Sequence, residues 1–187
     1  MKKFVLLLII ILLVTGCSVK KIGDVSDAER FAGEYEVEQN KAFKYVSIDE
    51  VIHLFEQGTG IVFFGNSDEE TSQEAVKIFN QALHESNISD IEIYYYNPSI
   101  IRDDSTEEYY KLIHLLGDNL TKNDYNEEYL FLPDIYFISD GKIIDHNNAA
   151  AFMIQAIDSD LVTDFKRNLK NEYIKLIKQY KEKDATK

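Results

Sequence analysis

The hydrophobic residues of this chain alternate between short apolar runs and segments in which they recur every three or four positions. The run at residues 61–64 is typical of a strand buried on both faces of a sheet, and residues 91–96 and 132–138 predict two further strands. Residues 75–83 carry apolar side chains at helical spacing. Strand, helix and strand in this order predict a right-handed βαβ unit with parallel strands.

Two serines mark the expected beginnings of helices. Glu50 follows Ser47 by three residues, and Glu70 follows Ser67 by three, which is the spacing of a capping box. In such a box the serine hydroxyl accepts a hydrogen bond from the glutamate amide, while the glutamate side chain reaches back. The sequence therefore predicts one helix from Ser47, after a short strand at residues 43–46, and another from Ser67.

The C-terminal part predicts a hairpin and a long helix. An Asp-Gly turn at residues 140–141 joins the strand at 132–138 to apolar residues 143–144, which favours an antiparallel pair. Apolar positions then recur at mostly helical spacing from residue 158 to about residue 181. We expect this helix to cover the sheet.

An insert is expected between the second and third of these strands. Residues 102–116 carry a helical period, and a polar stretch at 118–128 follows, so residues from about 99 to 130 form a helical insert over one edge. Tyr94-Tyr95-Tyr96 and Tyr109-Tyr110 form a tyrosine-rich band around it. These tyrosines are either core residues whose hydroxyls reach water or the lining of a peptide-binding surface.

The N-terminus has the pattern of an export signal. Lys2 and Lys3 precede an unbroken apolar run over residues 4–14. At about 1.5 Å per residue this run covers only about half of a hydrocarbon core of roughly 30 Å, so a permanent transmembrane anchor fits poorly. We therefore expect residues 1–16 to be a cleaved signal peptide.

Thr15-Gly16-Cys17 resembles the lipobox of bacterial lipoproteins, with Val14 where leucine is more usual. The resemblance implies cleavage before Cys17 and attachment to its thiol of a diacylglycerol that carries fatty acids such as palmitate. Two acyl chains bind a bilayer stably, whereas one binds reversibly. The resemblance thus implies a protein anchored by lipid at the outer face of the cell membrane.

The mature chain is expected to consist of a tether and one domain. Residues 17–42 are mostly polar with no sustained period, and we interpret them as the lipidated N-terminus and tether. The domain then spans residues 43–182, followed by a tail at 183–187. A short apolar-aromatic patch in the tether can dock on the domain as an N-terminal element; it consists of Phe31, Tyr35 and Val37.

Charge and cysteine content exclude several functions. The chain has 187 residues, with 33 Asp plus Glu against 20 Lys plus Arg, and its net charge of −13 repels polyanions such as nucleic acids. Cys17 is the only cysteine, which rules out an internal disulfide, a dithiol redox pair and a thiolate zinc site. No metal or cofactor is expected, because the four histidines have no ligand spacing; they are His53, His84, His114 and His146.

The order of predicted elements from residue 61 to residue 144 is similar to the thioredoxin fold. Gly60–Gly65 resembles the strand that leads to the active site, Leu132–Phe137 the cis-proline strand, and Asp140–Lys142 the turn after it. The resemblance implies an α/β three-layer sandwich with a central mixed sheet. The insert after Tyr94–Asn97 further resembles thioredoxin-like lipoproteins of Gram-positive bacteria and the bacteriocin-transport accessory group.

The redox motif of that family is missing from this chain. Glu69-Glu70-Thr71-Ser72 stands where Cys-x-x-Cys would be, so that Glu69 replaces the attacking cysteine and Ser72 the resolving one. A carboxylate at a helix N-terminus is stabilised by the helix dipole but cannot exchange with a disulfide. The resemblance therefore assigns no catalytic residue. Pro133 either fixes a turn or, as a cis-proline, presents the backbone of Leu132 as a peptide-binding groove beside Glu69.

Together these features predict a membrane-anchored extracytoplasmic lipoprotein without redox activity, which acts as a binding or accessory module in the cell envelope. The expected partners are the lipid bilayer, through acylated Cys17, and an envelope protein or exported peptide; cationic peptides suit the net charge. The alternative is an enzyme or a cation-dependent activity that uses the acidic helix terminus Asp68, Glu69 and Glu70. The simpler interpretation of these carboxylates is a well-capped helix start.

Overall fold

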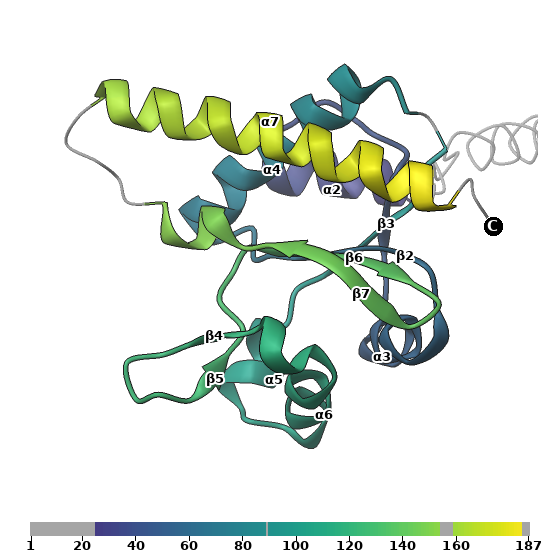
Figure 1. Cartoon of the computed structure of the whole chain (residues 1–187), viewed down its shortest axis with the longest axis vertical. Coiled ribbons are helices and arrows are strands. Elements are labelled where there is room, and N and C mark those ends of the chain that lie inside the picture. Colours follow the sequence, from purple (N-terminus) through teal and green to yellow (C-terminus); the bar gives the residue numbers. More distant parts are fainter. Residues whose placement is uncertain (1–24, 89, 154–158, 185–187) are drawn as a thin grey trace, which may run out of the picture.

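The computed structural model describes residues 25–88, 90–153 and 159–184, which are built around a five-stranded sheet (Figure 1). The strand order is β1-β3-β2-β6-β7, in which β1, β3 and β2 are parallel and β6 and β7 are antiparallel to their neighbours. The strands are β1 (Phe43–Tyr45), β2 (Gly60–Phe64), β3 (Ile93–Tyr96), β6 (Asp134–Ser139) and β7 (Lys142–Asn147). The predicted α/β class with a mixed central sheet is confirmed.

Helices cover both faces of the sheet, and the central strand β2 is therefore buried along its whole length. Ile61 and Phe63 belong to one core cluster, and Val62 and Phe64 belong to the other. The first face is covered by α2 (Asp27–Tyr35), α4 (Glu70–Ser86) and α7 (Ser159–Asp184), which lie above the sheet in Figure 1. The second face is covered by α3 (Ile48–Gln57) and α6 (Glu107–Leu116).

Helix α2 corrects the predicted tether. Phe31 and Tyr35 are buried in the first core cluster, and the Phe31 ring stacks on Phe43 of β1 with centroids 3.8 Å apart. Asp27 also accepts a hydrogen bond from the backbone amide of Tyr45, at the edge of the sheet. The apolar patch thus docks as a helix, and the folded domain begins before residue 43 because these side chains are part of its core.

One of the two predicted capping boxes is confirmed. Ser47 and Glu50 make both reciprocal hydrogen bonds at the start of α3. The box predicted at Ser67 is wrong, because Asn66 organises the loop after β2 instead. The Asn66 carbonyl accepts a hydrogen bond from the Glu69 amide and its side chain accepts one from the Asp68 amide, so the helix begins only at Glu70.

The insert contains more structure than its pattern predicts. The period over residues 102–116 is interrupted: α5 (Ser99–Asp103) ends before Thr106, whose side chain caps α6 by accepting a bond from the Tyr109 amide. The 3-10 helix η1 (Gly117–Asn119) follows, and the polar stretch carries a two-stranded antiparallel pair. The strands of this pair are β4 (Thr121–Lys122) and β5 (Glu128–Tyr129).

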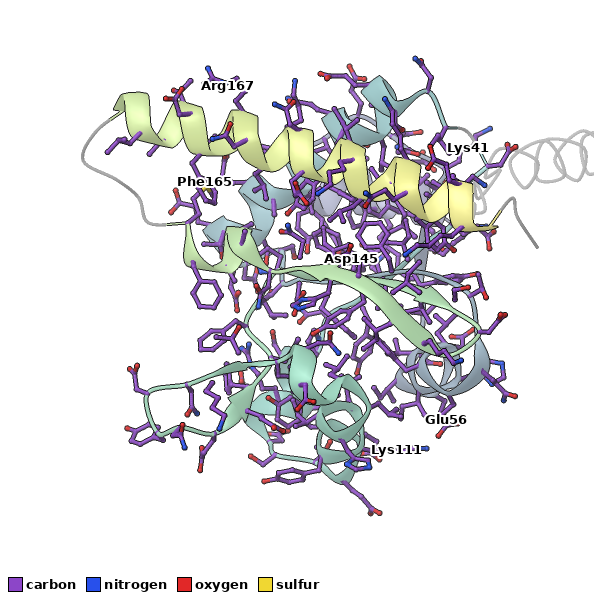
Figure 2. The ribbon with its side chains drawn as sticks, viewed as in Figure 1. Lys41, Glu56, Lys111, Asp145, Phe165 and Arg167 are labelled. Atoms are coloured by element: carbon purple, nitrogen blue, oxygen red, sulfur yellow. The ribbon has the colours of Figure 1, made fainter. Side chains whose placement is uncertain are left out.

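The insert and the turn between β6 and β7 both contact helix α3. An ion pair of 3.0 Å between Lys111 of α6 and Glu56 of α3 joins the insert to the second helical layer (Figure 2). The predicted turn between β6 and β7 is confirmed, with positive φ at both Asp140 and Gly141. A Cβ at Gly141 would lie 2.3 Å from the Glu56 carbonyl oxygen, so only glycine fits where the turn meets the end of α3.

Several sequence predictions concern residues outside the described ranges. These are the signal peptide at 1–16, the lipidation site Cys17 and most of the final tail at 183–187. Residues 154–158, where the last helix was expected to begin, are also outside; a short 3-10 helix, η2 (Ala149–Phe152), precedes them. Among the helices that the structure describes, none has the length and apolar character needed to cross a bilayer.

Two substitutions test whether α2 is a packed helix or a loose tether. Phe31→Ala should lower the free energy of unfolding by about 3–5 kcal/mol, because it leaves a cavity beside Phe43. Gly33→Ala should raise it by about 0.5–1 kcal/mol, because Gly33 is exposed in the helix and an added Cβ meets no atom within 4 Å. Urea unfolding followed by far-UV circular dichroism measures both. Unchanged stability in Phe31→Ala would contradict the docked helix.

Candidate functional site

The loop between β2 and α4 positions Glu69 and Ser72, the two residues that the sequence resemblance aligns with cysteines. Ser72 is fully buried, and its hydroxyl accepts a hydrogen bond of 3.1 Å from the Asn66 amide. Glu69 is the N-cap of α4, but its side chain makes no capping hydrogen bond. The two side chains thus have different roles: Ser72 holds the loop from inside, and Glu69 is available to other partners.

Arg102 of the insert is the partner of Glu69. Its guanidinium Nη2 lies 3.7 Å from the Glu69 carboxylate, and its Nε lies 3.1 Å from the Asp103 carboxylate. The guanidinium carbon also lies 5.4 Å from the ring centroid of Tyr129. Only 13% of the Arg102 side chain is exposed, against 33% for Glu69, so the insert covers this end of α4 with a largely buried cation.

The first turn of α4 also contacts the segment before β6. The bond between Leu132 and Pro133 is cis, and both residues are buried. The Thr71 hydroxyl donates a hydrogen bond of 3.4 Å to the Leu132 carbonyl. The structure therefore brings Glu69, Ser72, Leu132 and Pro133 into one neighbourhood. The direct contact is made by Thr71, which lies between the two positions that the motif singled out, and it joins the first turn of α4 to the backbone of Leu132.

The acidic residues at this helix terminus do not gather into a metal site. Glu69 pairs with Arg102, and the Asp68 amide is bound by the Asn66 side chain. Within the ranges that the structure describes, no three His, Cys, Asp or Glu side chains are placed to hold a metal ion together.

A buried carboxylate directly follows the cis-proline. Asp134 is 1% exposed; its Oδ2 accepts a hydrogen bond of 2.8 Å from the Tyr136 hydroxyl. Its Oδ1 lies 3.5 Å from Nδ1 of His146 on β7, and neither of these two atoms has a hydrogen-bond partner of normal geometry in the described part of the chain. The His146 ring stacks on Tyr136 with centroids 5.3 Å apart. Asp134 and His146 therefore join β6 and β7 beside the candidate site.

Burial and charge shift the titration of this pair. Burial raises the pKa of Asp134, although His146 and Tyr136 oppose the shift. The Asp134 carboxylate raises the pKa of His146, against the lowering effect of partial burial. Sequence reasoning missed the pair, because its members are twelve positions apart and meet only through the hairpin; the Asp-Gly turn between them is the signal that could have placed them on neighbouring strands.

A second feature that sequence reasoning missed is a crevice of about 500 Å³ outside the carboxyl ends of β1 and β3. Arg30 and Glu34 of α2 form one wall; Arg30 Nε donates to Glu34 at 2.9 Å, and its guanidinium lies 3.9 Å above the Tyr45 ring. Ser67, Tyr95 and Asn97 also line the crevice. This wall was not predicted because it belongs to α2, a helix that the sequence analysis did not predict. The sequence signal for that helix is the pair of aromatic residues Phe31 and Tyr35, which are four positions apart.

Two of the tyrosines named in the band are buried in the core, and the other three are partly or fully exposed. Tyr95 and Tyr109 are buried core residues, and the Tyr95 hydroxyl donates a bond of 3.2 Å to the Gly65 carbonyl. Tyr94 and Tyr96 are partly exposed on the other face of β3, and Tyr110 is exposed on α6. Strand alternation therefore decides which of the three consecutive tyrosines is in the core.

Known protein families, curated proteins and solved structures yield no match to this chain. The candidate site is therefore defined by its geometry. In the described ranges it combines a carboxylate, a guanidinium, an aromatic ring and a hydroxyl around a cis-proline. Such groups can hold a charged or hydrogen-bonding partner in a fixed orientation.

The Asp134 and His146 pair predicts a pH dependence of stability. The raised pKa of His146 means that its contribution is fully present below its ordinary pKa of about 6.5 and is lost as pH rises through the higher pKa of the folded state. The raised pKa of Asp134 acts in the same direction from about 3.8 upward, so the two do not oppose each other. Asp145 and Tyr173, which also interact with this pair, remain in every variant.

Urea unfolding between pH 5 and 9 measures this effect on the native chain and two variants, a range chosen around the ordinary histidine pKa of about 6.5. His146→Gln should lose the histidine's share of the fall in stability above about pH 6.5, while the share of Asp134 remains, and it should be less stable than the native chain at pH 6 by about 1–3 kcal/mol, because it leaves a buried carboxylate without its cation. His53→Gln, at an exposed position of α3, should keep the native profile. An unaltered pH profile in His146→Gln would contradict the role given to the pair.

Proposed function

We propose that this chain is an extracytoplasmic lipoprotein whose thioredoxin-like domain binds a partner instead of exchanging disulfides. It serves as an accessory module of the cell envelope, held at the outer face of the membrane by the acylated Cys17. Its partner is an envelope protein or an exported peptide. The net charge of −13 favours a cationic partner, since opposite charges accelerate encounter and align the two surfaces.

The topology supports the thioredoxin-like part of this proposal. A central β2 with a parallel neighbour on one side and an antiparallel β6 on the other leads through a short loop into α4. The cis-proline immediately precedes β6. Helical layers on both faces and the hairpin of β6 and β7 are compatible with the arrangement that the sequence resemblance implies.

The single observation that carries the proposal is the contact between Thr71 and Leu132. It places the first turn of α4 against the cis-proline segment, which is where thioredoxin-like proteins hold extended peptides. Glu69 and Ser72 occupy this turn in place of sulfur. A carboxylate cannot form a mixed disulfide, and the chain has no second cysteine to resolve one, so binding is the property left to this neighbourhood.

The positions assigned to the lost cysteines can be tested by restoring them. In a Cys17→Ala background, Glu69→Cys combined with Ser72→Cys should form a reducible disulfide and gain insulin-reducing activity, because the two positions are one helical turn apart at the N-terminus of α4. Thiol titration and an insulin-reduction assay measure the two results. Each single substitution is the control and should gain neither property.

Two results would overturn the proposal at this point. A folded double variant that forms no disulfide would show that the motif has been placed on the wrong residues. Insulin reduction by the native chain at the rate of the double variant would show that the protein has redox chemistry after all.

The lipid anchor has its own test. In a bacterial host fed an alkyne analogue of palmitate, the native chain should be labelled and should sediment with membranes until detergent is added, because two acyl chains hold a protein stably. Cys17→Ala should be unlabelled and absent from the detergent-released membrane fraction. Label in Cys17→Ala, or a native chain without label, would contradict lipidation of Cys17.

A further inference from the structure

The crevice outside the carboxyl ends of β1 and β3 lies where the connections of two neighbouring strands leave the sheet in opposite directions. After β2 the chain continues on the first face as α4, whereas after β3 it continues on the second face as the insert with α6. The two connections therefore diverge and leave room between them. In open α/β sheets, ligands bind outside the carboxyl ends of the strands at such a switch point.

This crevice is separate from the neighbourhood of the cis-proline. In the strand order, β3 and β6 lie on opposite sides of β2, and the cis-proline precedes β6. The residues that line the crevice do not include Glu69, Ser72, Leu132 or Pro133. A ligand held in the crevice would therefore be additional to the partner of the proposed function.

Hydrogen bonds between distant parts of the chain fix the walls of the crevice. The side-chain nitrogen of Gln73 on α4 donates to the Glu34 carbonyl at 2.9 Å and to the Ser67 carbonyl at 2.8 Å, which joins α2 to the loop after β2. The Tyr35 hydroxyl also donates to the Tyr95 hydroxyl at 3.0 Å. The volume of about 500 Å³ is thus formed in advance, as is usual for sites of small molecules.

Arg30 is held in one orientation with its terminal nitrogens unused. Its Nε donates to Glu34 at 2.9 Å, and its guanidinium carbon lies 3.9 Å from the centroid of the Tyr45 ring. Within the described ranges, its two terminal nitrogens make no hydrogen bond or ion pair. The side chain is 57% exposed, so a ligand can reach these nitrogens. A planar guanidinium presented in this way matches the two oxygens of a carboxylate.

Glu34 places the opposite charge beside Arg30. One of its oxygens accepts the bond from Arg30, and the other accepts a bond of 2.5 Å from the Tyr45 hydroxyl. Each carboxylate oxygen can accept more than one hydrogen bond, and 32% of the Glu34 side chain is exposed. A simple anion would be attracted by Arg30 and repelled by Glu34, and a simple cation the reverse. A molecule that carries both charges side by side is attracted by both residues.

We propose that this crevice binds a free α-amino acid, whose carboxylate pairs with Arg30 and whose ammonium group pairs with Glu34. An α-amino acid carries these two groups on one carbon atom, which matches the adjacent charges of the two residues. Val46 and the ring of Tyr45 also line the crevice and offer apolar surface to the ligand side chain. The site goes beyond the proposed function, because it uses neither the acyl chains nor the cis-proline neighbourhood.

The test is calorimetric titration of the full chain, in detergent micelles, with each of the common protein amino acids as the probe. At least one of them should bind. Its amide lacks the carboxylate, and its N-acetyl derivative lacks the ammonium group. Each derivative should bind the native chain about tenfold or more weakly than the free amino acid, because each loses one charge-assisted hydrogen bond.

Substitution of the two charged residues locates the site. Arg30→Gln and Glu34→Gln should each weaken binding of the amino acid about tenfold or more, for the same reason. Arg167→Gln is the matched control, because Arg167 is also exposed and also forms an ion pair, but lies on α7 (Figure 2); this variant should bind as the native chain does. Far-UV circular dichroism establishes that each variant is folded. The comparison of derivatives uses the native chain and so does not depend on the variants.

Three results would overturn the inference. The first is a native chain that binds none of the amino acids, and the second is binding of the amide and the N-acetyl derivative as tightly as the free amino acid. The third is undiminished binding in folded Arg30→Gln and Glu34→Gln. None of these results bears on the disulfide and lipidation tests, which concern the first turn of α4 and Cys17.

Discussion

Burial of β2 on both faces is the constraint on which the arrangement of this molecule depends. All five residues of the strand are buried, so one helical layer must cover Ile61 and Phe63 and another must cover Val62 and Phe64. The chain can leave such a strand only at its end, where Gly65 and Asn66 turn it into α4. The position of the candidate site follows from this exit, because α4 begins beside β6 and its cis-proline.

The candidate site is built from charged and hydroxyl side chains. Glu69, free of any capping bond, meets Arg102 from the insert, and the buried Ser72 keeps the loop in place. The insert is therefore part of the site as well as a cover for the second face of the sheet. Asp134 and His146 add a titratable connection between β6 and β7 next to the same proline. Under the proposed function, these groups would recognise a charged partner without a thiol.

Local sequence patterns predicted a helix, strand or turn correctly where one local interaction determines whether that element forms. The box at Ser47 formed as predicted, but the one at Ser67 did not, since Asn66 organises the preceding turn through the Asp68 and Glu69 amides and the helix begins only at Glu70. The central strands and the Asp-Gly hairpin were predicted because burial and positive φ leave strong signals. The aromatic patch of Phe31 and Tyr35 was recognised, but its helix α2 was not predicted, because the surrounding residues are polar and carry no sustained helical period.

The candidate site was predicted less completely than the fold. The motif placed Glu69, Ser72, Leu132 and Pro133 together, but their neighbour Thr71 and the cation Arg102 come from contacts across long sequence separations. Asp134 and His146 are another such contact, made by the pairing of β6 with β7. Spacing along a chain does not reveal which charges meet after folding.

The central claim is that the first turn of α4 lies against the residue before the cis-proline. Nuclear Overhauser contacts between the Thr71 side chain and the protons of Leu132 and Pro133, in selectively labelled protein, test it most directly. We expect these contacts together with those of the β2 and β6 pair Phe64 and Asp134. Strand contacts without any contact between Thr71 and Leu132 would contradict the account.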